Sequence, residues 1–151
     1  MEYGVFSKLV NDCKEKEPIL FGLEHDEILS IDEIEEFEEK IHIELPEKYK
    51  KFLSEYGGGY FGYANVYSLD EGSDFYLLHY NDVPVGKYLR IADNGCGDYY
   101  LLLVDDKKCS EQLYFYEHDE AAVCAAEYAD ILEYLVKEGL GIKGSDYHDL
   151  T

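Results

Sequence analysis

The chain of 151 residues carries 34 acidic and 13 basic residues, which gives a formal net charge of −21 at pH 7. Because proteins bind nucleic acids by placing Lys and Arg on phosphates, this charge argues against a nucleic-acid partner and favours a basic protein. The sequence has no apolar run of about 18 residues and no export signal at its start, so we expect no membrane contact and a cytoplasmic location.

The first predicted element is an amphipathic helix over residues 3–16. Phe6, Leu9 and Val10 fall on one side of it, and Pro18 ends it. Residues 19–29 then follow as a connector.

The stretch over residues 30–62 organises the rest of the chain. Ser30 and Glu33 have the spacing of a capping box, in which each side chain bonds the backbone N–H of the other residue, so we expect a helix to begin here. The apolar face of this helix consists of Ile31, Ile34, Phe37 and Ile41.

A second helix is predicted to start at Pro46, because proline suits the first helical position. Gly57 ends it, since glycine readily takes the left-handed conformation of a helix C-terminus. The apolar stripe of this helix consists of Tyr49, Phe52, Leu53 and Tyr56.

The second half of the chain predicts a largely antiparallel, mixed sheet and a closing helix. Asn94-Gly95 favours a hairpin between two of the strands, and the apolar run over residues 99–104 is typical of a central strand covered on both faces. The expected strands are residues 60–69, 75–80, 88–92, 99–104 and 113–117, and the closing helix is residues 128–139. We therefore expect one α+β domain over residues 1–143 and a frayed tail over residues 144–151.

The search for chemistry is mostly negative. The glycines after Tyr56 follow a helix instead of preceding one, which disfavours a phosphate loop. The four cysteines and five histidines lack the paired spacings of zinc sites, and no nucleophile motif is present. Acids at strand ends remain candidates for a cation, although turns favour Asp for their own reasons. We expect no enzyme activity, no cofactor and no metal.

Acidic residues concentrate on the helix over residues 30–41. Between Glu24 and Glu47 there are eleven acids and a single base, Lys40. This face could steer a basic partner or simply keep the protein soluble, and charge alone does not separate the two. The candidate steering residues are Glu35, Glu36, Glu38 and Glu39.

A second candidate surface starts at Gly57, because residues 57–86 contain four acids and no Lys or Arg. Tyr60 and Tyr63 could anchor a partner there, or they could pack internally. The acids that would orient the partner are Asp70, Glu71, Asp74, Asp93, Asp98, Asp105 and Asp106.

Several short motifs together resemble the SUKH superfamily of the Smi and Knr type. The motifs are I-x-x-F-E at residues 34–38, Leu45-Pro46, Y-K-x-F-L at residues 49–53, Y-G-G at residues 56–58 and NGCGDYYLL at residues 94–102. The resemblance implies an α+β domain of the kind found in bacterial immunity proteins, which neutralise polymorphic toxins, and in a yeast regulator of cell-wall synthesis.

With the acidic charge, this resemblance predicts a non-enzymatic immunity protein that binds a basic toxin domain, for example a nuclease. The alternative is a regulatory adaptor that binds another cellular protein. The oligomeric state is left open.

Overall fold

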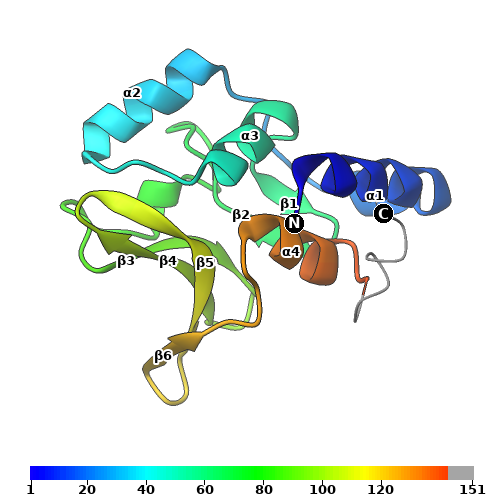
Figure 1. Cartoon of the computed structure of the whole chain (residues 1–151). Helices are drawn as coiled ribbons and strands as arrows, with labels where there is room; N and C mark the ends of the chain where they lie inside the picture. Colours follow the sequence, from blue (N-terminus) through cyan, green and yellow to red (C-terminus); the bar gives the residue numbers. More distant parts are fainter. Residues whose placement is uncertain (143–151) are drawn as a thin grey trace.

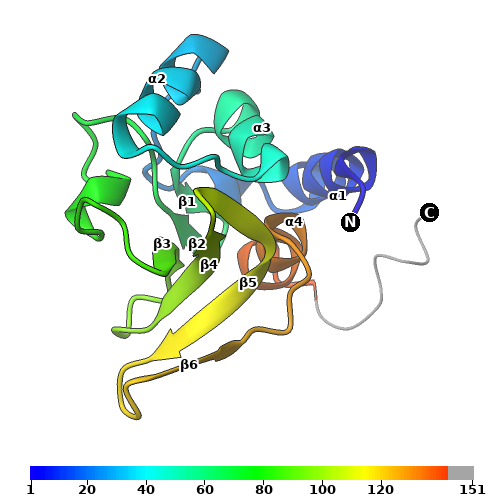
Figure 2. The ribbon, with the colours of Figure 1, turned by 60° about the vertical axis from the view of Figure 1, so that its left-hand side comes forward.

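The computed structural model describes residues 1–142 and confirms an α+β fold. The strands form one six-stranded antiparallel sheet in sequence order, and the helices lie together on one side of it (Figures 1 and 2). The strands are β1 (Gly59–Phe61), β2 (Ala64–Val66), β3 (Tyr88–Asp93), β4 (Tyr99–Asp105), β5 (Lys108–Glu117) and β6 (Ala122–Ala125).

The helices supply most of the apolar layer that covers the inner face of the sheet. They are α1 (Tyr3–Lys16), α2 (Ile31–Ile41), α3 (Glu47–Glu55) and α4 (Ile131–Tyr134), and α4 continues as a π-helical turn over Leu135–Gly139. Short 3₁₀ helices lie at Pro18–Phe21 and Leu77–His79. Within residues 1–142, no helix is both long enough and apolar enough to span a bilayer.

Helix α2 begins as its sequence predicts. Ser30 Oγ accepts the Glu33 N–H at 3.1 Å, and the Glu33 carboxylate accepts the Ser30 N–H at 3.2 Å. Ile34 and Phe37 are buried against the core, but Ile31 is 69% exposed, so its assignment to the apolar face was wrong. Ile31 is the first residue of α2.

Helix α3 and the glycines after it hold the centre of the fold. Phe52 and Leu53 are fully buried, and Gly57 has the left-handed φ of 78° that was predicted. A Cβ on Gly57 would lie 2.4 Å from the carbonyl oxygen of Asp26. The glycines therefore serve close packing of the connector, whose His25 pairs with Gly59.

Two predicted strands are different in the structure. The predicted strand over residues 60–69 is replaced by a tight hairpin, β1 and β2, which ends at Val66. The chain reverses at Gly62, where φ is 58° and a Cβ would lie 2.0 Å from the Gly139 carbonyl oxygen. Residues 75–80 contain a 3₁₀ helix, not a strand, since the backbone N–H groups of Tyr76 and His79 each bond a carbonyl three residues back.

The end of the chain also shows boundary differences. Strand β5 begins at Lys108, five positions before the predicted residue 113, and β6 was not predicted. Helix α4 begins after Asp130, whose side chain accepts the Glu133 N–H at 2.9 Å, so Tyr128 precedes the helix. The predicted tail over residues 144–151 lies outside the described residues, and the domain limit at residue 143 stays a prediction.

Candidate functional site: a tyrosine groove on the open sheet face

The outer face of the sheet carries an unusual set of aromatic side chains. The strand alternation directs Leu89 and Leu102 into the core and leaves Tyr88 and Tyr99 on the outer face, each only partly buried. Across β4 and β5, Tyr99 is paired in register with Tyr116. The four α-helices lie on the other face (Figure 2), and this face is covered in part by the 3₁₀ helix Leu77–His79 and the loop that follows it. Leu101 and Leu102, on opposite faces of β4, are both almost completely buried, so the middle of this strand is covered on both sides as predicted, whereas Tyr99 is only partly buried.

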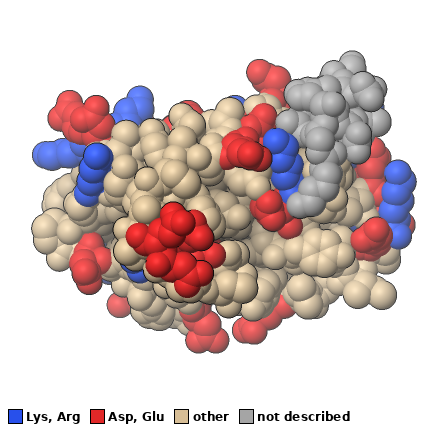
Figure 3. Space-filling model, turned by 90° about the horizontal axis from the view of Figure 1, so that it is seen from below, with Lys and Arg blue, Asp and Glu red and all other residues tan. Residues whose placement is uncertain are grey.

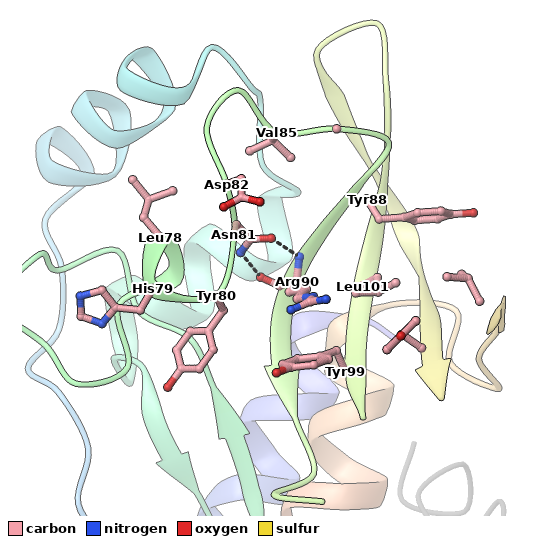
Figure 4. A pocket seen from close by; sticks show the side chains of 13 residues that line it. Leu78, His79, Tyr80, Asn81, Asp82, Val85, Tyr88, Arg90, Tyr99 and Leu101 are labelled. Carbon is pink, nitrogen blue, oxygen red and sulfur yellow. Dashed lines mark hydrogen bonds between the residues drawn. The ribbon is translucent and has the colours of Figure 1, made fainter. Parts of the chain in front are cut away.

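A groove of about 500 Å³ lies on this face. One wall is the loop from Leu78 to Gly86, and the opposite wall is formed by β5 and β6 through Tyr116 and Val123 (Figure 4). Leu101 lies in the floor and is almost completely buried. The groove thus combines an apolar floor with walls that carry hydroxyl, amide and charged groups.

Arg90, the single arginine of the chain, projects into this groove. Its guanidinium carbon lies 4.1 Å from the ring centroid of Tyr99 and 5.8 Å from that of Tyr116. Stacking on two rings is favourable for a guanidinium, which is weakly hydrated and planar. The stack orders three side chains of the groove before any partner arrives.

Asn81 fixes the loop wall to β3. Its Nδ2 donates to the carbonyl oxygens of Leu77 and Arg90, both at 2.9 Å, and its Oδ1 accepts the Arg90 N–H at 2.8 Å (Figure 4). Strand β2 pairs with β3 only at Ala92 and Asp93. The Asn81 amide therefore takes the place of a neighbouring strand beside Arg90 and holds the groove open.

A buried tyrosine pair supports the inner end of the groove. The rings of Tyr67 and Tyr80 stack at 3.9 Å, and the Tyr67 hydroxyl donates to the Asp93 carboxylate at 2.6 Å. Burial, together with this hydrogen bond, raises the pKa of Tyr67 far above its ordinary value, so its hydroxyl stays protonated. Tyr80 lines the groove, and its stacking on Tyr67 holds its ring in place.

Four of the predicted acidic residues serve the fold, and Asp98 is one of them. Asp93 binds Tyr67, Asp70 accepts the backbone N–H of Gly72 in its own turn, and Glu38 accepts the Leu45 N–H at 2.8 Å and pairs with Lys50.

Asp98 joins two turns at one end of the sheet. It accepts the His118 N–H at 3.0 Å, and it lies 2.6 Å from His118 Nδ1. These hydrogen bonds, with one from Asn94, lower the pKa of Asp98 to about 2, and the same carboxylate raises the pKa of His118. The pair ties the β3–β4 turn to the β5–β6 turn.

The other predicted residues lie on the surface, away from the groove lining. Tyr60 and Tyr63 are 42% and 67% exposed, but they belong to the hairpin at the β1 edge, and Tyr60 packs on Phe75. Glu35, Glu36 and Glu39 are exposed on α2. Four further acids, at the end of β4 or in loops and turns, are also exposed: Glu71, Asp74, Asp105 and Asp106. The structure therefore does not gather the predicted residues into one site.

The groove residues were missed although the sequence contained a signal for them. Tyr88 and Arg90 alternate with Leu89 and Ile91, the pattern of a strand with one face in the core. The loop over residues 78–86 could be located only in three dimensions, because its contact with β3 depends on the Asn81 side chain.

Acidic side chains lie close to the groove. Asp82 is in its lining, and Glu117, Asp119 and Glu120 belong to or border the β5–β6 turn. The face of the molecule seen from below has a large acidic group near its middle, with most Lys and Arg toward the margins (Figure 3). No group of three His, Cys, Asp or Glu residues within residues 1–142 is placed to hold a metal ion.

Comparisons with known proteins agree with this architecture. Residues 28–136, which include the whole groove, match the sequence model of the SMI1 / KNR4 family (SUKH-1). A crystal structure of a protein from Pseudomonas syringae pv. tomato has a similar fold, with a TM-score of 0.65 and 20% sequence identity over 90% of this chain and 99% of that chain. At this identity the likeness concerns the fold alone. No curated protein matches the chain.

Proposed function

Because the chain belongs to the SMI1 / KNR4 family (SUKH-1), we propose that it is an immunity protein that binds and neutralises a basic toxin domain, for example a nuclease, without catalysing a reaction. The observation that carries the proposal is the ordered tyrosine groove on the open sheet face, with Arg90 stacked at its centre. The family resemblance suggests the class of partner, and the groove suggests where it binds.

The groove has the composition of a protein-binding surface. Tyrosine and arginine are enriched at interfaces because they combine large contact area with polar tips. Here Tyr88, Tyr99 and Tyr116 are half-buried and pre-positioned by ring contacts, so binding costs little side-chain entropy. A partner side chain that enters the groove would cover rings that are already in place.

The charge distribution suits a basic partner. The net charge of −21 creates a field that attracts cationic proteins over a range set by the ionic strength. Exposed acids on α2 and beside the groove would act on association, whereas the desolvated rings would set the dissociation rate. The two predicted roles, steering and anchoring, thus fall on different residues.

The test uses the toxin domain encoded beside the gene of this chain, as a purified catalytically inactive variant. Tyr88→Ala combined with Tyr116→Ala should weaken its binding by about 30-fold or more, since hot-spot truncations cost about 2 kcal/mol or more. The matched control, Tyr60→Ala combined with Tyr63→Ala, removes two exposed tyrosines from the far edge of the sheet and should leave the Kd unchanged.

Cell survival during co-expression of the active toxin gives the functional readout. The parent and the control pair should protect, and the groove pair should fail although it remains folded. Equal protection by both pairs would contradict the groove as the binding site. Absence of any binding by the parent would contradict toxin neutralisation and would favour the regulatory adaptor.

A further inference from the structure

Strand β6 is the outer strand of the sheet, and its free edge is a place where a partner strand can add. It pairs with β5 on one side, from Glu117 opposite Ala122 to Tyr114 opposite Ala125. On its other side, no strand or backbone hydrogen bond from residues 1–142 reaches it (Figure 2). All four residues of β6 are exposed.

The edge has the features that permit pairing. Its sequence is Ala-Val-Cys-Ala, without charge, proline or glycine. Natural sheets usually protect such an edge with a charged side chain, a proline or a bulge within the strand. In an antiparallel pair, every second residue directs its N–H and C=O away from the neighbouring strand. Ala126 donates to Leu113 at 3.1 Å, so Cys124 and Ala122, in steps of two from it, also face β5. Val123 and Ala125, which alternate with them, direct their N–H and C=O groups outward.

The edge is continuous with the groove. Val123 lies opposite Tyr116 in the register and lines the groove wall. A strand added beyond β6 would therefore extend the open face, and alternate side chains of that strand would stand beside Val123 and the tyrosines. Main-chain pairing and side-chain anchoring would then act on one continuous surface.

Charges at both ends of β6 indicate what kind of strand it accepts. Glu117, Asp119 and Glu120 precede it, and Glu127 follows it two positions after its end. The Asp98–His118 contact at 2.6 Å holds the turn that carries the first group. The uncharged centre and the acidic ends match an extended segment with an uncharged, β-forming centre and Lys or Arg at its ends.

We propose that β6 captures such a basic-ended segment of a partner protein by strand addition. This inference rests on the proposed function, for which it names the mode of binding: the toxin domain would contribute an edge strand or an extended loop. Backbone hydrogen bonds would supply affinity, and the groove would select side chains.

A second copy of this chain is a poor occupant of the same edge. An antiparallel pairing of two β6 strands through their outward residues, centred on Val123, places Asp119 of each copy opposite Glu127 of the other, and the pairing centred on Cys124 brings Glu127 to one position from the partner's Glu120. Like charges directly opposite one another destabilise strand pairing. The charge pattern therefore disfavours self-association and favours a basic partner.

The test titrates the parent protein with a synthetic peptide, KKVTVTVKK, and with the matched control peptide EEVTVTVEE, at low ionic strength. The lysine peptide should shift the amide resonances of residues 122–125 and slow amide exchange of Val123 and Ala125 by about ten-fold or more at saturation. The glutamate peptide should do neither. Equal effects of both peptides, effects confined to other residues, or a concentration-dependent dimer formed through β6 would overturn the inference.

Variants separate strand addition from simple charge attraction. Ala125→Pro removes an outward N–H that β5 does not use, and it should abolish the response. Ala129→Pro removes an N–H outside the sheet, which donates to the Glu133 carboxylate at 2.7 Å, and it should preserve the response. If Ala125→Pro unfolds the edge, Ala125→Lys provides the second test, because an edge lysine would repel the cationic peptide ends. An undiminished response in a folded Ala125 variant would contradict strand addition.

The toxin domain distinguishes this inference from the proposed function. Toxin binding without protection of Val123 and Ala125 would overturn strand addition and leave neutralisation intact. Lysine-peptide protection at β6 in a chain that binds no toxin would overturn neutralisation and leave strand addition intact.

Discussion

Asn81→Ala should destabilise the protein by detaching the groove wall from β3. The substitution removes two hydrogen bonds to the Arg90 backbone, at 2.8 and 2.9 Å, and a third to the Leu77 carbonyl. A hydrogen bond contributes about 1 kcal/mol net, and a group left unsatisfied in a partly buried place costs at least that. The two Arg90 bonds therefore predict a loss of about 2 kcal/mol in the free energy of unfolding.

Urea denaturation measures this loss, and amide exchange locates it. The Arg90 amide should exchange faster in Asn81→Ala, while amides in α3 should change only with global stability. Asp82→Ala is the matched control, since Asp82 is an exposed neighbour in the same loop, and it should change stability by less than about 0.5 kcal/mol. A loss below about 0.5 kcal/mol for Asn81→Ala, with unchanged exchange at Arg90, would refute the role given to this amide.

Three further predictions concern the core, a turn and the acidic helix. Leu53→Ala, at a fully buried position, should cost about 2 to 5 kcal/mol in denaturant unfolding, and a loss under about 1 kcal/mol would contradict its core position. Asp98 raises the pKa of His118 in the folded protein, so the pairing stabilises the fold fully at pH values below the ordinary histidine pKa of 6.5. This stabilisation is lost as the pH rises through the pKa that His118 has in the folded protein. NMR titration of His118 should give a midpoint above 6.5 that falls in Asp98→Asn, and an unchanged midpoint would contradict the contact. The exposed acids of α2 are Glu35, Glu36 and Glu39. Replacing them by Gln should slow association with a basic partner several-fold at low salt and little at high salt. Association rates equal to those of the parent at both salt concentrations would assign this face to solubility.

Local sequence rules worked best where the signal and the structure are both local. The Ser30–Glu33 capping box depends on neighbouring residues only, and the left-handed Gly57 follows from the end of the helix before it; both are present in the structure. The hairpin at Gly62 was missed because its cause is distant: the Gly139 carbonyl approaches from the other end of the chain. Strand β6 is short and exposed, so its sequence carries no core pattern to identify it.

The site was harder to predict than the fold for a related reason. An acidic residue looks the same in sequence whether it faces a partner or serves the fold, as Asp93 and Asp98 do through Tyr67 and His118. Tyr60 and Tyr63 were the tyrosines predicted as possible anchors, and only the sheet register shows which tyrosines share the open face. Charge predicted the type of partner, and three-dimensional packing was needed to propose its place.

The central claim is that the partner binds the open sheet face through the tyrosine groove. Cross-saturation NMR on a complex with the proposed toxin partner measures this directly, because it reports which residues of this chain lie at the interface. The strongest saturation should fall on the amides of Tyr88, Arg90, Tyr99, Tyr116 and Val123, which all line the groove. Saturation confined to α2, or to Tyr60 and Tyr63 at the opposite edge of the sheet, would contradict it.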